Sequence, residues 1–196
     1  RFVCPDFMRS VYFTSPEIGY AVGNAATILK TLNGGKTWVK CDKFPKGLSS
    51  NLSSVYFPDA ANGYAVSWGG EIIKTIDSGA SWKLLKKRTG VMLYAVYFTS
   101  VDTGYICGDK GKLLKTVNGG ITWKELVSNT EFILASIHFN GKNTGYVCGE
   151  DGIILKTTDA GATWKEQYSG TNNILTDIYF PNSNTGYIVG FKQTIL

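Results

Sequence analysis

A fixed pattern of apolar and polar positions recurs five times along the chain. Each copy opens with an apolar triplet, and a Gly-Tyr pair begins six residues after the last residue of that triplet. Successive Gly-Tyr pairs are 44, 41, 41 and 41 residues apart. A period of about 40 residues built from strand-like segments is typical of four-stranded propeller blades rather than of helical repeats. The triplets are Val11-Tyr12-Phe13, Val55-Tyr56-Phe57, Val96-Tyr97-Phe98, Ile137-His138-Phe139 and Ile178-Tyr179-Phe180, and the pairs begin at Gly19, Gly63, Gly104, Gly145 and Gly186.

The third copy predicts all four strands of one blade, because it contains no insertion. Residues 95–99 alternate as an innermost strand that starts with a small residue, which suits a crowded propeller axis. Residues 104–108 and 113–116 predict the second and third strands, and an outer strand begins at Trp123. The chain is therefore predicted to be all-β and to form a single propeller domain over residues 1–196. Its four-stranded antiparallel blades are expected at residues 9–42, 53–86, 94–127 and 135–168, with an incomplete blade at residues 176–196.

A turn motif of the form Thr-x-Asp/Asn-x-Gly-x-Thr/Ser-Trp joins the third and fourth strands of four copies. The Asp or Asn side chain can accept hydrogen bonds from backbone N–H groups of the turn, and the glycine supplies a positive φ. The tryptophan is expected to anchor the hairpin between sheets. We therefore expect structural roles, and no metal or catalytic role, for these residues. They are Asn33, Gly35, Trp38, Asp77, Gly79, Trp82, Asn118, Gly120, Trp123, Asp159, Gly161 and Trp164.

The turn motif resembles the Asp-box, also called the BNR repeat, of sialidase-like and sortilin-like propellers. In those families the box is a folding element on the side away from the ligand. The complete repeat, with SVYF, GYAVG, ILKT and the Trp-ended turn, resembles the photosystem II stability/assembly factor family and its bacterial relatives over essentially the whole chain. The resemblance implies a lumenal or secreted assembly factor that binds a protein subunit. We therefore expect an extracytoplasmic location, which means periplasmic, lumenal, cell-surface or secreted.

Charge bears on the choice of partner. Photosynthetic members of the family that the chain resembles use an arginine-rich patch to contact their subunit. The arginines here are three and scattered, at Arg1, Arg9 and Arg88, so we expect a different protein or a glycan as partner. The net charge of +5, from 20 Lys and Arg against 15 Asp and Glu, is spread along the chain, and we expect no nucleic-acid partner.

The fifth copy ends at Leu196, before a turn motif and a fourth strand. Residues 1–5 correspond to the end of a fourth strand, so one hypothesis is a five-bladed ring that this segment completes. The other hypothesis is a fragment of a larger propeller, which we favour because the chain begins without Met and stops within a strand. An open blade edge exposes unpaired backbone groups, so self-association is expected if the propeller is open.

Composition and cysteine usage exclude further classes of protein and of site. The chain is 43% hydrophobic and 18% charged, which indicates a folded protein rather than a disordered one. No segment approaches the roughly 18 consecutive apolar residues of a membrane helix. The cysteines lack CxxC spacing and histidine neighbours, so we expect no zinc site, no other metal and no cofactor. Cys107 and Cys148 fill a position that valine fills in other copies and are expected in the core, whereas a Cys4–Cys41 disulfide is left open.

The loops between the second and third strands differ among copies, although the strands around them agree. Positions that the fold dictates should agree among repeats, so these loops and the connectors on the same face are predicted to carry recognition. Trp68 is the strongest candidate, because a tryptophan on a short glycine-rich loop is expected to be exposed. The candidate binding residues are Trp68, Asp109, Lys110, Glu150, Asp151, Phe191 and Lys192 on loops, and Lys86, Lys87 and Arg88 on a connector.

Catalysis is the alternative to binding. A sialidase needs an arginine cluster, and the single histidine, His138, replaces a repeated tyrosine and is expected in the core rather than in a catalytic site. A glycosidase needs only two carboxyl groups on one face. We therefore predict a non-catalytic binding or assembly scaffold, with a glycoside hydrolase as the alternative. The carboxyl groups for that alternative are Asp109, Glu150, Asp151 and Asp177.

Overall fold

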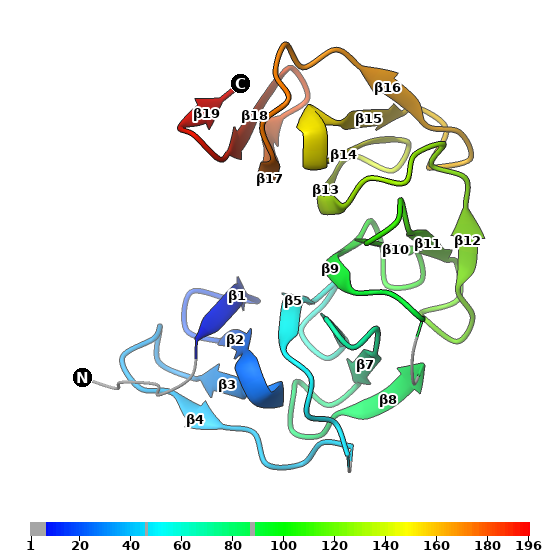
Figure 1. Ribbon diagram of the computed structural model, residues 1–196. Coiled ribbons are helices and arrows are strands. Elements are labelled where there is room, and N and C mark those ends of the chain that lie inside the picture. The colour runs from blue at the N-terminus through cyan, green and yellow to red at the C-terminus, as the bar shows by residue number, and fades with distance from the viewer. Residues whose placement is uncertain (1–6, 46, 87–88) are drawn as a thin grey trace. The chain divides into compact units, whose positions relative to one another are not determined.

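The computed structural model describes residues 7–45, 47–86 and 89–196. Within these ranges the chain folds into four antiparallel sheets of four strands and one of three, with almost no helix (Figure 1). Each sheet runs in chain order from an inner to an outer strand, which is the arrangement of a propeller blade. The predicted all-β propeller fold, with four complete blades and an incomplete fifth, is confirmed. None of the described helical segments is long and apolar enough to cross a membrane.

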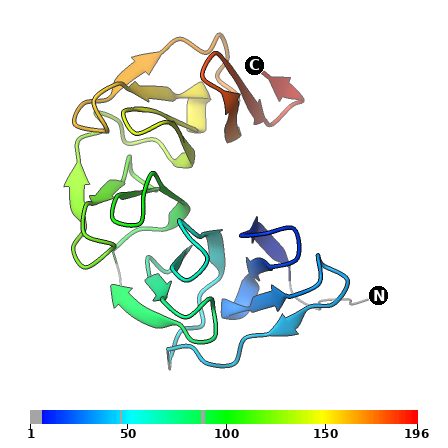
Figure 2. The ribbon, with the colours of Figure 1, turned by 180° about the vertical axis from the view of Figure 1, so that it is seen from behind.

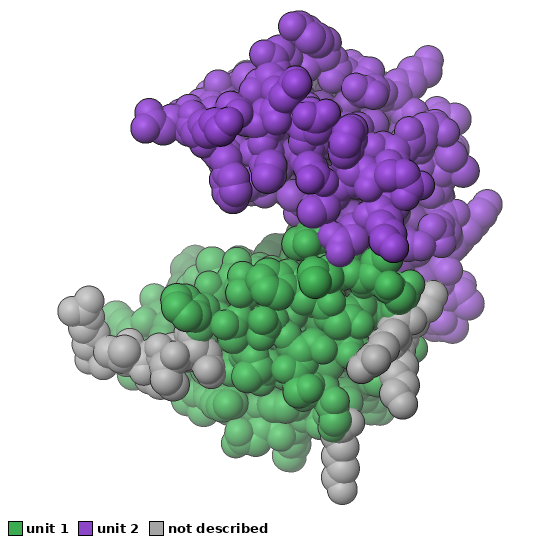
Figure 3. All heavy atoms as spheres, viewed as in Figure 1, with its two compact units in different colours: residues 1–101 green, residues 102–196 purple. Residues whose placement is uncertain are grey.

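The chain divides into two compact units, residues 1–101 and residues 102–196 (Figure 3). The expectation of a single domain stays a prediction. The first unit, coloured from blue to green in Figures 1 and 2, holds blades 1 and 2 and the inner strand of blade 3. Its strands are β1 (Met8–Phe13), β2 (Gly19–Gly23), β3 (Ile28–Thr31) and β4 (Val39–Lys40) in blade 1, β5 (Leu52–Tyr56), β6 (Gly63–Ser67), β7 (Ile72–Thr75) and β8 (Lys83–Lys86) in blade 2, and β9 (Leu93–Phe98).

The second unit holds the other strands of blade 3 and all of blades 4 and 5. Short 3-10 turns, η1 (Asn24–Ala26) in the first unit and η2 (Glu150–Gly152) in the second, lie in loops between second and third strands. The strands of the second unit are β10 (Gly104–Gly108), β11 (Leu113–Thr116) and β12 (Lys124–Leu126) in blade 3, β13 (Leu134–Asn140), β14 (Thr144–Gly149), β15 (Ile154–Thr157) and β16 (Lys165–Gln167) in blade 4, and β17 (Leu175–Asn182), β18 (Thr185–Gly190) and β19 (Thr194–Ile195) in blade 5.

The repeated glycine of each Gly-Tyr pair makes room for the phenylalanine of the triplet in the same blade. In blade 1, Phe13 of β1 lies opposite Gly19 of β2. A Cβ added at Gly19 would lie 2.6 Å from the Phe13 ring, and one added at Gly63 would lie 2.4 Å from Phe57. Any side chain there would displace the ring, so the sequence pattern reflects a packing requirement.

The repeated tyrosine joins each blade to the next within a unit. Tyr20 of blade 1 stacks on Phe57 of blade 2 with ring centroids 4.0 Å apart, and Tyr105 stacks on Phe139 at 4.1 Å in the second unit. The hydroxyl of Tyr20 also donates a hydrogen bond to the Ser78 carbonyl at 2.7 Å. Burial raises the pKa of Tyr20 to about 12. We call this stacked pair with its hydrogen bond the interblade joint.

The lysine repeated in the third strands takes part in the same joint. Lys30 Nζ donates to the Ser78 carbonyl at 2.7 Å, and Lys115 Nζ donates to the Ala160 carbonyl at 2.6 Å. Each lysine thus shares its acceptor with the tyrosine of its own blade, because Tyr105 donates to Ala160 as well. Its aliphatic stem lies along apolar surface while the ammonium binds a backbone carbonyl, which explains why the residue recurs.

The turn motif forms a compact hydrogen-bonded loop. In blade 2, Thr75 Oγ1 accepts the Gly79 N–H at 2.9 Å, and Asp77 Oδ1 accepts the Ser81 N–H at 2.8 Å. The second carboxylate oxygen accepts the Ser81 hydroxyl at 2.6 Å, and these bonds lower the pKa of Asp77 to about 2. Gly79 adopts φ +75, which only glycine takes readily. The same bonds recur around Asp159 in blade 4.

The tryptophan that ends the motif packs against the same phenylalanine that covers the glycine. Trp82 is 3% exposed and meets Phe57 edge-on at 5.9 Å, and Trp164 is 5% exposed and meets Phe139 at 6.1 Å. Edge-to-face aromatic pairs add about 0.5–1.5 kcal/mol beyond the area that they bury. Trp38, in blade 1, is less deeply buried than these two.

The small residue at the start of the inner strands has a hydrogen-bonding role that crowding alone does not explain. The Ser10 hydroxyl accepts the Val55 N–H of the next inner strand at 3.2 Å, and the Ser54 hydroxyl accepts the Val96 N–H at 3.3 Å. These bonds tie neighbouring inner strands together where their backbones do not pair directly. A hydroxyl here satisfies an N–H group that the sheet leaves unpaired.

Candidate functional site

Arg9 lies at a β-bulge near the start of β1. The register of β1 against β2 shifts between Met8 and Ser10, so Arg9 is the extra residue. A bulge re-aims the side chain that it carries. The Arg9 guanidinium carbon lies 3.8 Å from the ring centroid of Trp68, and its Nε donates to Asn24 Oδ1 at 2.9 Å. We call Arg9, Asn24 and Trp68 the arginine–tryptophan platform.

The same bulge occurs in blades 2, 4 and 5, but it carries different residues there. The extra residue is Ser53 in blade 2, Ala135 in blade 4 and Thr176 in blade 5. Ser53 donates to the carbonyl of Leu93 at 2.6 Å, and Thr176 donates to that of Val189 at 3.2 Å. These side chains are small and their bonds end on the backbone. Among the four blades compared, blade 1 alone places a long cation at the bulge.

Trp68 lies on the loop between β6 and β7, as the sequence indicated, but it is half-buried rather than exposed. The guanidinium of Arg9 covers one face of its ring. The backbone N–H of Trp68 donates to the Asn51 carbonyl at 2.9 Å, so the loop is held to the connector that precedes β5. The loop contact and the guanidinium together hold Trp68, whose side chain stays partly exposed.

Glu71 holds the same loop in place through hydrogen bonds, and the sequence pattern did not point to this residue. Its side chain is 7% exposed. One carboxylate oxygen accepts the Ser50 hydroxyl at 3.2 Å, and the other accepts the Ser67 hydroxyl in a short contact. A Cβ added at Gly69 would lie 2.3 Å from this carboxylate, which explains why the loop is rich in glycine. Glu71 thus has a structural role.

The electrostatics of the platform favour an anionic ligand. Arg9 is exposed, and Nε is the donor that it uses within the described part of the chain. No carboxylate among residues 7–45, 47–86 and 89–196 forms an ion pair with it. An arginine whose planar group is stacked on a ring keeps its outer N–H groups available for a bidentate carboxylate or phosphate.

Two of the expected acids in the second unit, Glu150 and Asp177, each form hydrogen bonds with other parts of the chain. Glu150 Oε2 accepts the Ile133 N–H at 3.3 Å and so holds a connector. Asp177 Oδ1 accepts the Ser136 hydroxyl at 2.8 Å and the Ile178 N–H at 2.9 Å, which fixes the start of β17. No group of three or more His, Cys, Asp or Glu residues suited to a metal ion occurs in the part of the chain that the structure describes.

Lys110 and Asp109 lie on the loop between β10 and β11. Lys110 is exposed with φ +55, and it lines a polar groove of about 610 Å³ together with Glu125 and Glu131. Glu125 forms a 2.6 Å ion pair with Lys112. Asp109 is partly buried, and its Oδ1 accepts no hydrogen bond from described residues. The remaining candidates on loops of this unit, Asp151, Phe191 and Lys192, are exposed.

Several expectations fall on residues that the structure does not describe. Lys87 and Arg88 of the basic connector lie outside the described residues, and so does Cys4. Lys86 ends β8. The basic connector and the Cys4–Cys41 disulfide therefore stay predictions. Cys148 is fully buried, as expected, and burial raises the pKa of its thiol to about 12.

His138 of β13 was expected in the core, and it packs against aromatic rings of β17 as a half-buried residue. Its ring meets Tyr179 edge-on at 5.2 Å and lies 5.9 Å from Phe180. Burial lowers the pKa of His138, and the charge of Asp177 partly opposes this effect. The ring therefore serves as a packing group.

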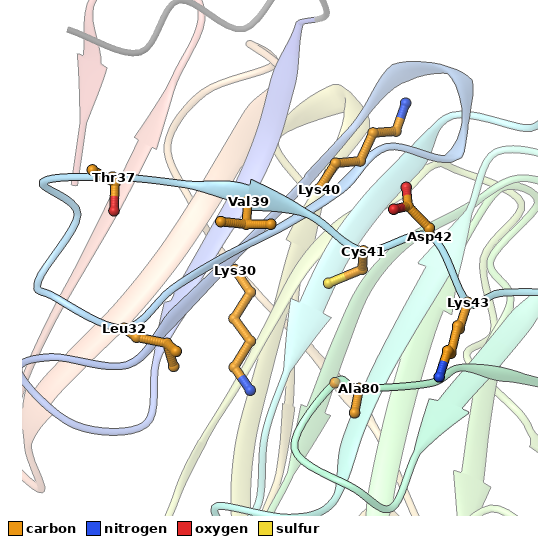
Figure 4. A pocket seen from close by; sticks show the side chains of 10 residues that line it. Lys30, Leu32, Thr37, Val39, Lys40, Cys41, Asp42, Lys43 and Ala80 are labelled. Atoms are coloured by element: carbon orange, nitrogen blue, oxygen red, sulfur yellow. The ribbon is translucent and has the colours of Figure 1, made fainter.

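A pocket of about 430 Å³ lies at the turn-motif side of blade 1, between β4 and the turn of blade 2 (Figure 4). Leu32, Val39 and Ala80 give it apolar walls, and Cys41 lies among them. The ammonium of Lys30, which also lines it, is bound to the Ser78 carbonyl. Burial raises the pKa of the Cys41 thiol, which disfavours the reactive thiolate.

Residues 74–168 match a family model described as photosynthesis system II assembly factor YCF48. The chain resembles the YCF48 family. The match covers parts of blades 2 to 4, including turn motifs in each of these blades. The resemblance that the sequence motifs indicated is thus confirmed. No curated protein matches the chain significantly.

Solved structures of YCF48 share the fold. The YCF48 structure from Cyanidioschyzon merolae is 18% identical with a TM-score of 0.76, over 98% of this chain and 67% of that one. A structure described as YCF48 bound to D1 peptide is 15% identical with a TM-score of 0.59, over 97% of this chain and 92% of that one. At these identities the likeness shows the fold alone.

The structure of a glycoside hydrolase is also similar to this chain. The GH74 enzyme from Niastella koreensis is 19% identical with a TM-score of 0.75, over 93% of this chain but only 34% of the enzyme. This chain therefore spans about a third of that enzyme's length. The propeller fold is common to YCF48 and to GH74, so the choice between binding and hydrolysis depends on the residues of the site.

Proposed function

We propose that the chain is a non-catalytic binding or assembly scaffold that holds an acidic segment of a protein partner on the arginine–tryptophan platform. The observation that carries this proposal is the guanidinium of Arg9, which stacks 3.8 Å from the Trp68 ring centroid and has no ion-pair partner among the described residues. The resemblance to YCF48 supports a protein as the partner, since one YCF48 structure is bound to a D1 peptide. An extracytoplasmic location belongs to the same proposal.

The aromatic side chain of Trp68 and the cationic side chain of Arg9 suit the binding of an acidic segment for separate reasons. Arginine and tryptophan are the residue types that most often dominate binding energy at protein interfaces. The ring fixes the plane of the guanidinium, so less conformational entropy is lost when a carboxylate binds. Asn24 Oδ1 accepts the Arg9 Nε–H at 2.9 Å, which leaves the two terminal nitrogens of the guanidinium as the donors for a ligand. An acidic peptide fits this chemistry better than a neutral glycan.

The test measures binding of acidic peptides directly. An array of ten-residue peptides with graded numbers of Asp and Glu identifies a binder, and fluorescence polarisation of that peptide gives its Kd. Trp68→Ala and Arg9→Ala are each expected to weaken binding roughly 30-fold, which corresponds to about 2 kcal/mol. Arg9→Lys, which keeps the charge but loses the planar stack, is expected to recover only part of the affinity.

Lys36→Ala serves as the matched control, because Lys36 is an exposed cation on the turn between β3 and β4 of blade 1 and is not a candidate binding residue. It should leave the Kd within about twofold if the platform is the site. Equal losses in Lys36→Ala and Arg9→Ala would mean that binding follows net charge. An absence of any acidic binder, or a binder unaffected by Trp68→Ala, would overturn the proposal.

Glycoside hydrolysis is the second function, because the GH74 fold is similar over 93% of this chain. It requires two carboxyl groups that are available to substrate on one face. Glu150 and Asp177 each accept hydrogen bonds from the protein, which leaves Asp109 and Asp151 as the acids for this function. Release of reducing sugar from a glycan panel, abolished by Asp109→Asn or Asp151→Asn, would establish hydrolysis and remove the scaffold proposal.

A further inference from the structure

The middle residues of the repeated triplets form a second aromatic contact between blades, separate from the interblade joint. In the first unit these residues are Tyr12 in β1, Tyr56 in β5 and Tyr97 in β9. The ring centroids of Tyr12 and Tyr56 lie 4.8 Å apart, and those of Tyr56 and Tyr97 lie 4.9 Å apart. Aromatic rings at such separations are in van der Waals contact. We call these three side chains the tyrosine row.

The tyrosine row differs from the interblade joint in the chemistry of its neighbours. In the joint a tyrosine stacks on a phenylalanine, as Tyr20 does on Phe57. In the row a phenol meets a phenol, and Tyr56 has one on each side. The strands that carry the row are joined close to it, because the Ser10 hydroxyl accepts the Val55 N–H at 3.2 Å. The spacing of the rings is therefore set by the backbone as well as by their own packing.

The hydroxyl groups of Tyr12 and Tyr56 stay protonated at neutral pH. Burial raises the pKa of Tyr12, and burial together with the neighbouring phenols of Tyr97 and Tyr12 raises the pKa of Tyr56. A protonated phenol is a weak base and a weak nucleophile. The reaction that remains open to the row is therefore the loss of an electron together with the phenol proton.

We propose that the tyrosine row is a site of oxidative cross-linking, at which a one-electron oxidant joins Tyr56 to Tyr12 or to Tyr97 as dityrosine. Each phenol of the reacting pair gives one electron to the oxidant and its hydroxyl proton to water. The two phenoxyl radicals then form a carbon–carbon bond between ring carbons ortho to the oxygens. The hydrogen on each of these carbons moves to the oxygen of its ring through water, which restores both phenols. The net change is the loss of two electrons and two protons.

The geometry favours a bond within one chain over a bond between chains. Two groups that are held in contact react at an effective concentration far above that of free reactants. Tyr56 has a phenol neighbour on each side, so every link within the row requires it. A link between residues 12 and 56, or between residues 56 and 97, closes a loop and restricts the unfolded chain. The oxidised protein is therefore expected to be the more stable form.

Photo-oxidation of the full chain tests the proposal, with tris(bipyridyl)ruthenium(II) and persulfate as the source of a one-electron oxidant. We expect dityrosine fluorescence in protein that stays monomeric on a denaturing gel, with a mass lower by two hydrogen atoms. Tandem mass spectrometry of a tryptic digest should find Tyr56 joined to Tyr12 or to Tyr97. The midpoint of urea unfolding should rise after oxidation.

Tyr56→Phe keeps the ring and removes the phenol that both links require. It is expected to lose the dityrosine signal of the monomer and the rise in the urea midpoint. The double variant Tyr12→Phe and Tyr97→Phe should show the same loss, because both phenol neighbours of Tyr56 in the row are then gone. Tyr20→Phe is the matched control, since Tyr20 stacks on Phe57 and its removal should leave the signal unchanged.

Circular dichroism identifies the variants that fold, and either Tyr56→Phe or the double variant suffices for the test. Monomer dityrosine in that variant equal to the wild-type signal overturns the proposal. A wild-type protein that forms no dityrosine within the monomer overturns it too, and so do linked peptides that lack Tyr56.

Discussion

The two ends of the first unit's blades use polar side chains in different ways. At the turn-motif end, Tyr20 and Lys30 both donate to the Ser78 carbonyl, and a matching pair does the same in the second unit. At the loop end, Arg9 contacts the side chains of Asn24 and Trp68, and the bulges of blades 2, 4 and 5 carry no comparable cation. Contacts that repeat and end on the backbone maintain the fold, whereas a contact that occurs once and leaves donors unused is suited to recognition.

Gly79→Ala is expected to give the largest effect, because it breaks the turn-motif end of this comparison. A Cβ at Gly79 would lie 2.6 Å from Tyr20 Cε1, and the residue has φ +75. Overpacking a tight contact and placing alanine at positive φ each cost about 1–3 kcal/mol. We expect the free energy of unfolding, measured by urea titration, to fall by roughly 3 kcal/mol.

Gly90→Ala separates the two causes. Gly90 has φ +85, but a Cβ there would meet nothing within 4 Å. It therefore keeps the backbone cost without the clash, and we expect a loss of about 1 kcal/mol. Similar losses in the two variants would mean that the contact with Tyr20 contributes little, and the distinction between the two ends of the blade would be weakened.

The turn-motif end was largely predictable from the sequence, because one period encodes it. Gly161 adopts φ +79, and the carboxylate of Asp159 accepts hydrogen bonds from the turn. Both features follow from local turn chemistry that four copies repeat. The repeated tyrosine and lysine could be assigned to the frame for the same reason. The backbone carbonyl that accepts hydrogen bonds from both side chains could not be predicted, because a carbonyl of a neighbouring blade does not depend on the side-chain types in the sequence.

The loop end was predictable only in part. Disagreement among copies pointed to Trp68, and the structure shows that its ring is half-covered by Arg9. Arg9 was counted among scattered arginines, because the two residues are far apart in the sequence and belong to different blades. The same criterion would have found it: the corresponding positions before the small residue are Ser53, Tyr94, Ala135 and Thr176, so the copies disagree there too. The bulge that aims the side chain depends on strand register, which the sequence does not reveal.

Acid is expected to weaken the turn-motif end of the blades. The pKa of Asp77 and that of Asp159 are lowered to about 2 by hydrogen bonds from the turn. Because the folded pKa lies below the unfolded value of about 3.9, the ionised carboxylates stabilise the fold above pH 4, and this contribution is lost as the pH falls toward 2. Urea midpoints measured from pH 5 to pH 2 should therefore decline.

Asn is the matched replacement for these carboxylates, because Asn33 and Asn118 occupy the same position in blades 1 and 3 and accept the same backbone N–H. The double variant Asp77→Asn and Asp159→Asn should fold, with a shallower decline of the urea midpoint between pH 4 and pH 2. An unchanged pH profile would show that other carboxyl groups cause the acid sensitivity and that the turns contribute little to it.

Arg9→Ala is expected to give the smallest change in stability, and it decides whether the loop end is separate from the fold. Arg9 is exposed, and a cation–π contact at an exposed site contributes about 0.5–1 kcal/mol. Its removal leaves Asn24 accessible to water, so no buried polar group loses its partner. We expect the free energy of unfolding to fall by less than about 1 kcal/mol, while affinity for an acidic peptide falls far more. A loss of stability as large as that of Gly79→Ala would show that Arg9 maintains the fold like the residues of the interblade joint, and the contrast between the two ends of the blades would not hold.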